Sequence, residues 1–165
     1  MQATATQFMA WSDNWLVGIR EVDTQHKHLV SLLNKLHEAM GRGEGKKLLG
    51  SILSELVNYT KAHFAGEERL MRQYNYAEYN AHKQEHDRLA GQVLQFQQTF
   101  SSGGASVSSS VDVLHFLRNW LQNHICGTDK KYVPFLPSGE QGEWIANGRE
   151  YYLTRPESGC ELAEP

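Results

Sequence analysis

The sequence predicts an all-α fold, an up-down-up-down antiparallel four-helix bundle with an N-terminal arm and a short C-terminal extension. Two observations predict this fold. Apolar residues recur at spacings of three and four along four long segments, which is the pattern of helices that each bury one stripe. Short connecting runs rich in glycine, serine or asparagine separate the segments, as expected for antiparallel neighbours. We therefore expect the arm over residues 1–17, the bundle over 18–136 and the extension over 137–165.

The N-terminal arm lacks a clear helical period, so we expect it to lie across the outside of the bundle. Its apolar anchors are Phe8, Trp11, Trp15 and Leu16. The first helix is predicted to begin at Ile19 or Asp23 and to end at Met40. A glycine-rich run follows it, and glycine readily adopts the left-handed conformation that ends helices.

The second and third helices are predicted over residues 46–72 and 77–100. Asn75, between them, is a good turn residue. After the third helix, the serine- and glycine-rich run 101–110 predicts a flexible connection.

The fourth helix is predicted to begin at residue 111 or 112 and to end between 125 and 132. Pro134 and Pro137 prevent its simple continuation. In the extension, scattered aromatic residues predict one short docked element around residues 144–153.

Composition excludes several classes of protein. The 165 residues suffice for one domain with a core of its own, and a net charge of −3 offers no basic patch for nucleic acid. No apolar run is long enough to insert in a membrane, and residues 1–11 do not resemble a signal peptide. Cys126 and Cys160 are too few for a disulfide framework, so we expect a reduced, cytoplasmic protein in which Cys126 is a free thiol.

Histidine is the unusual feature of this composition. The chain has eight histidines, and His63 precedes Glu67 by four residues, just as His82 precedes His86. Residues four apart project from the same face of a helix. The candidate metal-ligating side chains are His26, His63, Glu67, His82, His86, His124 and Asp129.

These side chains fall at one level of the predicted bundle. His26 is near the start of the first helix and His63 near the end of the second, while the pair on the third helix is early and His124 is late on the fourth. In an antiparallel bundle all these positions belong to the same end. A chance scatter of histidines would rarely agree in this way.

The number of donors indicates two metal ions. Seven side chains are too many for one tetrahedral zinc, and carboxylates can bridge two ions. Five imidazoles then divide three to two, so the metal ion with only two imidazole ligands keeps an open coordination position for a small ligand such as dioxygen. The chain has no Glu-x-x-His sequence of the kind found in oxygen-activating di-iron bundles. We therefore hypothesise that this histidine-rich set favours reversible binding over O–O cleavage.

Asp129 is the least regular of the donors. Its offset of five residues from His124 is about 140° out of phase on a regular α-helix. It could join the site only through a locally loosened turn, which Gly127 would assist, or a long reach. The alternative is a solvated carboxylate at a helix end.

The other histidines and nearby polar residues have simpler interpretations. His28 and His115 are predicted to be exposed, and His37 to be buried with an ordinary partner. Glu68 is predicted to face solvent, and Tyr59 either donates to a ligand or only packs. Residues that could fix the orientation of a ligating imidazole, but that spacing does not assign, are Gln25, Asn58, Glu85 and Asn123.

Four motifs together resemble the hemerythrin family, specifically the single-domain bacteriohemerythrins. The matching segments are Asp23–Lys27 (DTQHK), His63–Met71 (HFAGEERLM), His82–His86 (HKQEH) and His124–Asp129 (HICGTD), within a region from Trp11 to Phe135. The resemblance implies two iron ions with a bridging oxo or hydroxo group, and dioxygen bound end-on at one iron. Residues after 136 lie outside the resemblance.

The resemblance also implies a role for each donor. His82, His86 and His124 would hold one iron, and His26 and His63 would hold the oxygen-binding iron. Glu67 and Asp129 would bridge the two. The apolar ligand pocket of the family corresponds to Leu29, Phe64, Trp120, Leu121 and Ile125. Such a dry lining would keep water and protons from releasing the bound ligand.

Taken together, these observations predict reversible dioxygen binding for oxygen storage, transport or delivery, and not an enzyme. Two alternatives remain open. An oxygen or redox sensor would signal to a protein partner, and its candidate output surface is residues 138–165. A di-iron enzyme consuming peroxide or nitric oxide would need an electron donor, and the sequence has no cofactor-binding motif for one. No recipient or signalling partner can be identified.

Overall fold

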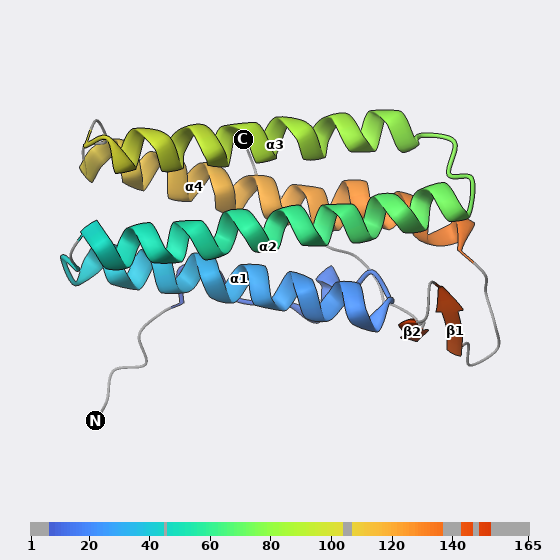
Figure 1. The fold of residues 1–165 in the computed structure, drawn as a ribbon. Helices are drawn as coiled ribbons and strands as arrows, with labels where there is room; N and C mark the ends of the chain where they lie inside the picture. The colour runs from blue at the N-terminus through green and yellow to red at the C-terminus, as the bar shows by residue number, and fades with distance from the viewer. Residues whose placement is uncertain (1–6, 45, 104–106, 137–142, 147–148, 153–165) are drawn as a thin grey trace, which may run out of the picture.

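The computed structural model describes residues 7–44, 46–103, 107–136, 143–146 and 149–152. Four long helices run in alternating directions: α1 (Arg20–Gly41), α2 (Lys46–Gln73), α3 (Tyr79–Ser101) and α4 (Val107–Asn123) (Figure 1). The predicted all-α, up-down-up-down four-helix bundle is confirmed.

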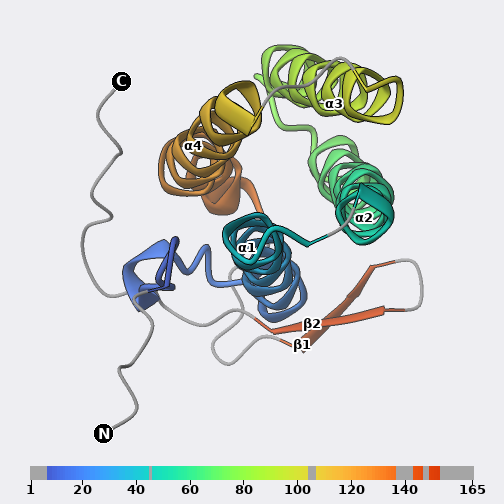
Figure 2. The same cartoon turned by 90° about the vertical axis from the view of Figure 1, so that its left-hand side faces the viewer.

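The helices surround one hydrophobic core. Viewed along the bundle, α1 to α4 enclose a common centre, and each helix lies beside its neighbour in sequence (Figure 2). Every helix contributes to a single buried cluster, represented by Leu32 on α1, Leu53 on α2, Leu89 on α3 and Leu114 on α4. The period of three and four in the sequence is therefore the stripe that each helix turns inward.

The predicted helix boundaries agree closely for α1, α2 and α3. The prediction for α4 was wrong at its start, because the helix already begins at Val107, within the run expected to be a flexible connection. Serine disfavours the helix interior only weakly, and the helix that follows overrides that preference. Residues 104–106 of the same run lie outside the described residues.

The end of α4 departs from regular geometry. His124–Asp129 form one turn of π-helix, η2, which leads into the short helices α5 (Lys130–Tyr132) and η3 (Val133–Phe135). Pro134 lies within η3, where a proline at the start of a turn lacks only a hydrogen bond that would be unmade anyway.

The described part of the N-terminal arm packs against the bundle. The Met9 N–H donates to Asn34 Oδ1 at 2.9 Å, and Asn34 Nδ2 donates to the Met9 carbonyl, also at 2.9 Å. Met9 is buried, and so is Trp15 in the 3-10 turn η1 (Asp13–Trp15). The first six residues of the predicted arm lie outside the described residues.

Asp23 joins the arm to α1. Its carboxylate accepts the backbone N–H of Val17 at 2.7 Å and that of Gly18 at 3.1 Å. Gly18 has a φ of 87°, a left-handed conformation that a side chain would strain. The buried turn at the start of α1 therefore depends on one carboxylate and one glycine.

The turn between α2 and α3 confirms one prediction, and the state of Cys126 contradicts another. Asn75, between α2 and α3, has a φ of 53°, as its sequence preference predicts. Cys126 is disulfide-bonded, so the prediction of a free thiol was wrong. The only other cysteine in the sequence, Cys160, lies outside the described residues.

The short element predicted in the C-terminal extension is a β-hairpin. Strand β1 (Glu143–Ala146) pairs antiparallel with β2 (Arg149–Tyr152), with Glu143 opposite Tyr152, and β2 lies beside α1 (Figure 2). Across the described ranges, no helix combines the length and apolarity needed to cross a membrane.

Candidate metal centre

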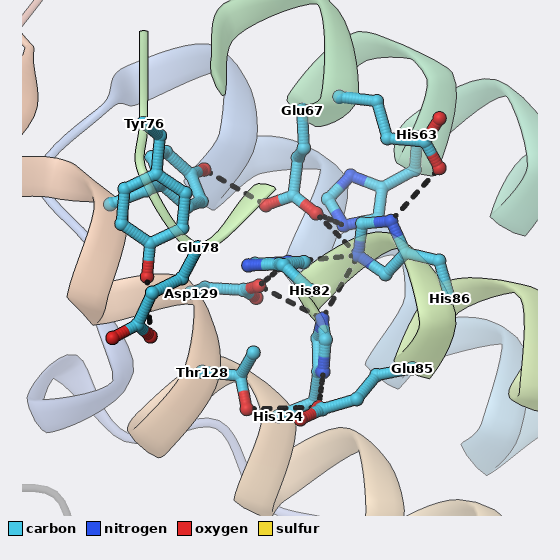
Figure 3. A network of polar contacts seen from close by, with 12 residues as sticks. His63, Glu67, Tyr76, Glu78, His82, Glu85, His86, His124, Thr128 and Asp129 are labelled. Atoms are coloured by element: carbon cyan, nitrogen blue, oxygen red, sulfur yellow. Dashed lines mark hydrogen bonds and ion pairs between the residues drawn. The ribbon is translucent and has the colours of Figure 1, made fainter. Parts of the chain in front are cut away.

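The seven predicted donors converge at one end of the bundle. Each comes from the level expected of it, and none is more than 3% exposed. Helical spacing alone brings His63 above Glu67 and His82 above His86, and the alternating directions of the helices bring the pairs together (Figure 3). The donor atoms fall into two groups that share Glu67.

The first group contains three imidazoles. The Nε2 atom of His86 lies 3.0 Å from that of His82 and 3.0 Å from that of His124. Asp129 Oδ1 completes this face, at 2.9 Å from His124 Nε2 and 3.2 Å from His82 Nε2. Three ring nitrogens and a carboxylate oxygen therefore point at one small volume.

The second group contains two imidazoles. His63 Nε2 lies 3.5 Å from Glu67 Oε2, and His26 Nε2 lies 3.9 Å from Glu67 Oε1. The rings of His26 and His63 meet edge to face, with centroids 4.8 Å apart. This group has one imidazole fewer than the first.

Both carboxylates span the two groups. Asp129 directs Oδ1 at the three-histidine group, while its Oδ2 lies 3.2 Å from His26 Nε2. Glu67 Oε2 lies 3.5 Å from His63 and 3.4 Å from His86 Nε2, so it faces both groups. This is the arrangement that two bridging carboxylates require.

The residues fit a bound cation pair. Buried polar atoms without a hydrogen-bond partner include His26 Nε2, Glu67 Oε2 and both carboxylate oxygens of Asp129. Leaving such atoms unsatisfied costs about 1–3 kcal/mol each, and more for charged groups. Metal coordination would satisfy all four, since imidazole and carboxylate are common ligands of transition metals.

The π-helical turn resolves the uncertain phase of Asp129. A turn closed by i→i+5 hydrogen bonds holds more residues than an α-helical turn, so it brings residues five apart closer to one face, and this turn runs from His124 to Asp129. The two side chains consequently touch, and Asp129 is fully buried. The alternative of a solvated carboxylate is excluded by this burial, and the locally loosened turn is confirmed.

Three imidazoles have a polar partner on the outward ring nitrogen. Gln25 Oε1 lies 2.8 Å from His63 Nδ1, Glu85 Oε2 lies 3.1 Å from His124 Nδ1, and Glu68 Oε1 lies 3.3 Å from His86 Nδ1. Such acceptors fix which ring nitrogen faces a metal. The prediction that Glu68 faces solvent was wrong, because the side chain is only 13% exposed.

Tyr132 was not identified from the sequence. Its hydroxyl donates to Glu67 Oε1 at 2.9 Å, and the residue is fully buried. The bond holds one oxygen of the shared carboxylate. A tyrosine three residues after Asp129 was the available signal, but its direction depends on the π-helical turn between them.

The protein environment shifts the pKa values of two of the imidazoles in opposite directions. Burial lowers the pKa of His63 to about 4 against the opposing charge of Glu67. Burial also opposes charge on His124, yet Asp129 and Glu85, one on each ring nitrogen, raise its pKa to about 10. Metal bound at His124 would therefore have to displace a proton.

Aromatic rings and an apolar cavity lie on the side of the donors toward the bundle centre. Phe64 stacks on His86 at 3.8 Å between centroids, and Trp120 stacks on His124 at 4.3 Å. Beyond them lies a cavity of about 20 Å³ that includes four predicted pocket residues, Leu29, Phe64, Trp120 and Leu121. Ile125 is fully buried but does not line this cavity. Six further lining residues were not predicted: Leu33, Leu56, Thr60, Leu89, Val93 and Leu117.

The three remaining histidines stay outside the cluster. His115 is exposed, as predicted, whereas His28 is half-buried, with its Nε2 atom 3.7 Å from Glu55 Oε1. The prediction that His37 is buried was wrong, since it lies exposed and stacks on Phe8 of the arm, with ring centroids 4.4 Å apart. Tyr59 packs against the His28 ring, with centroids 4.3 Å apart.

Comparison with known proteins identifies a family that covers most of the chain. Residues 17–136 match the family model described as the hemerythrin HHE cation binding domain. A bacteriohemerythrin of Methylococcus capsulatus is 40% identical over 114 residues, which cover 69% of this chain and 85% of that protein. One of Pseudomonas aeruginosa is 36% identical over 153 residues, covering 88% and 97%.

A solved structure extends the likeness to the fold. The crystal structure of a wild-type hemerythrin superposes with a TM-score of 0.71 at 37% sequence identity. The match covers 77% of this chain and 96% of that one.

Proposed function

The chain belongs to the hemerythrin family, and on that premise we propose that it binds dioxygen reversibly at a non-heme di-iron centre, for oxygen storage, transport or delivery. The observation that carries the proposal is the division of the donors. Two buried groups, one with three imidazoles and one with two, share two carboxylates.

In this proposal each donor has one role. His82, His86 and His124 hold one iron, and His26 and His63 hold the other. Glu67 and Asp129 bridge them, as their positions between the two groups support. The two-histidine iron has one protein ligand fewer, so it keeps a coordination position for dioxygen.

When bound, the iron pair supplies the electrons for reversible dioxygen binding, and the protein controls its surroundings. Tyr132 holds Glu67 through a 2.9 Å hydrogen bond, which limits the movement of one bridge. Stacking on Phe64 and Trp120 fixes two imidazoles. The apolar cavity beyond these rings favours a small uncharged gas over water.

The donor chemistry supports binding rather than turnover. Two carboxylates among seven donors bring little negative charge to the irons. A site with less anionic charge stabilises high-valent iron less, so it disfavours cleavage of the O–O bond. We therefore propose that the protein is not an oxidase or peroxidase.

Reduction and reoxygenation of the iron-loaded protein tests the proposal. We expect two irons per chain and a coloured species that forms with dioxygen and disappears when the gas is removed. Prompt and irreversible conversion to the diferric state would instead favour a sensor or an enzyme. A single metal per chain would overturn the proposal.

Two variants on the same helix make the test specific. His26→Gln removes a donor of the two-histidine group, so we expect the iron content to fall from two toward one per chain and reversible colour to be lost. His28→Gln, two residues away, is the matched control and should retain both, because His28 is half-buried and belongs to neither donor group.

A further inference from the structure

The outward nitrogens of the candidate ligands have unequal partners. In the three-histidine group, His86 and His124 each meet a carboxylate, from Glu68 at 3.3 Å and Glu85 at 3.1 Å. In the two-histidine group, His63 meets the neutral amide of Gln25 at 2.8 Å. The outward nitrogens of His26 and His82 have no hydrogen-bond partner in the described structure. The carboxylates that contact outward imidazole nitrogens are therefore all found at the three-histidine group.

Neighbouring charges do not remove this difference. Glu85 also accepts the Thr128 hydroxyl at 3.0 Å, which directs its oxygen toward His124 (Figure 3). Lys83, a cation that interacts electrostatically with Glu68, donates a hydrogen bond to Asp87 at 2.6 Å. Glu21 lies behind Gln25, whose amide donates to it at 3.3 Å, so the group that contacts His63 Nδ1 directly is neutral.

A carboxylate that accepts the outward N–H of an imidazole makes the opposite ring nitrogen a stronger donor. A stronger donor favours the more highly charged ion, which is iron(III) rather than iron(II). We infer that Glu68 and Glu85 are positioning residues that make the three-histidine iron the first to be oxidised, while Gln25 keeps the two-histidine iron ferrous. This inference rests on the proposed di-iron function, and it adds the order in which the two irons lose electrons.

The redox step uses an added oxidant. One electron passes from the three-histidine iron to hexacyanoferrate(III), so that iron(II) becomes iron(III) and the oxidant becomes hexacyanoferrate(II). A second equivalent oxidises the two-histidine iron in the same way. The two steps should have separate potentials, with the three-histidine couple the lower.

The test replaces a charged side chain by a neutral one of the same shape, or the reverse. Glu68→Gln and Glu85→Gln should each raise the potential of the first step, and Gln25→Glu should lower that of the second. We expect about a tenfold change in the ferric-to-ferrous preference, which for one electron is about 59 mV. Glu78→Gln is the charge-matched control, because Glu78 contacts Tyr76 and no imidazole, and it should leave both potentials unchanged.

Azide identifies which iron is oxidised, because it binds an open position on iron(III). Native protein should bind azide only after the second electron is removed. The combined variant Glu68→Gln/Glu85→Gln/Gln25→Glu should bind it after the first. Azide binding by native protein after one electron would overturn the inference.

The outcomes separate this inference from the proposed function. Protein that binds two irons and dioxygen reversibly, but whose potentials in Glu68→Gln and Glu85→Gln match the control, supports the function and overturns the inference. Absence of a di-iron site overturns both.

A second measurement covers variants that load iron poorly. In zinc-loaded protein, the Nδ1 proton resonances of His86 and His124 should move upfield in the glutamine variants, because a neutral acceptor forms a weaker bond. Unchanged resonances would contradict the inference.

Discussion

At the scale of single residues, His124 carries the strongest electrostatic signature of the site. It lies between Asp129 at 2.9 Å and Glu85 at 3.1 Å, one on each ring nitrogen. In metal-free protein the imidazolium form is an ion pair with both carboxylates. His63 differs, because burial keeps its ring neutral.

These two residues predict how the stability of metal-free protein depends on pH. His63 has a pKa of about 4 in the folded state against 6.5 unfolded, so stability falls as pH drops below 6.5. His124 has a pKa of about 10 when folded, so its contribution is complete below 6.5 and is lost as pH rises through 10. The unfolding midpoint of the chelated protein should therefore be highest near pH 6.5.

Thermal unfolding between pH 4 and pH 10 checks this prediction. His124→Gln should flatten the alkaline side of the profile and leave the acid side, which depends on His63. A midpoint of native protein that climbs steadily to pH 9 would contradict the raised pKa of His124.

At the scale of elements, two departures from regular helix shape the site. The π-helical turn brings Asp129 to the face of His124, and the buried turn before α1 ties the arm to the bundle. Lys130, just after the π-helical turn, donates to the Asn14 carbonyl of the arm at 2.6 Å. The arm therefore also contacts the segment that carries the candidate ligands.

Asp23 connects the N-terminal arm to α1 by accepting two backbone hydrogen bonds. Asp23→Ala leaves two backbone N–H groups of a buried turn without an acceptor, so we expect the free energy of unfolding to fall by about 3 kcal/mol. For a chain of this size that lowers the midpoint by about 6–12 °C. Thr24→Ala, which removes an exposed hydroxyl bonded to the Arg20 carbonyl, should change stability by less than about 0.5 kcal/mol. Equal midpoints of the two variants would refute this role of Asp23.

At the scale of the whole molecule, one end of the bundle is polar and buried, while the rest of its interior is apolar. Helix packing from four directions supplies the donors, and the same packing removes them from water. The free-energy cost of burying these polar and charged groups is normally offset by a bound ion.

Metal removal should therefore lower stability more than it changes helix content. Each iron present at a thousandfold excess over its Kd contributes about 4 kcal/mol, so two irons should raise the unfolding midpoint by roughly 15–30 °C. Calorimetry and circular dichroism of loaded and chelated protein measure both quantities. A midpoint unaffected by chelation would show that the buried donors are not metal ligands.

The sequence by itself determined the bundle, the bounds of three helices and the set of candidate donors, since these follow from local spacing. Helical periods of three and four mark the buried stripe, and residues four apart must share a face. The donors chosen from that spacing are the residues that the structure brings together, and their binding of iron stays a prediction.

Only the tertiary structure decided the surroundings of those donors. The partners Glu68 and Tyr132, the exposure of His37 and the extent of the apolar cavity depend on how helices rotate against one another. Asp129 lies between the two cases, since its spacing required an irregular turn and the fold supplied it. The physical reason is that periodicity depends on the residues of one helix alone, whereas contacts between helices depend on the packing of the whole bundle.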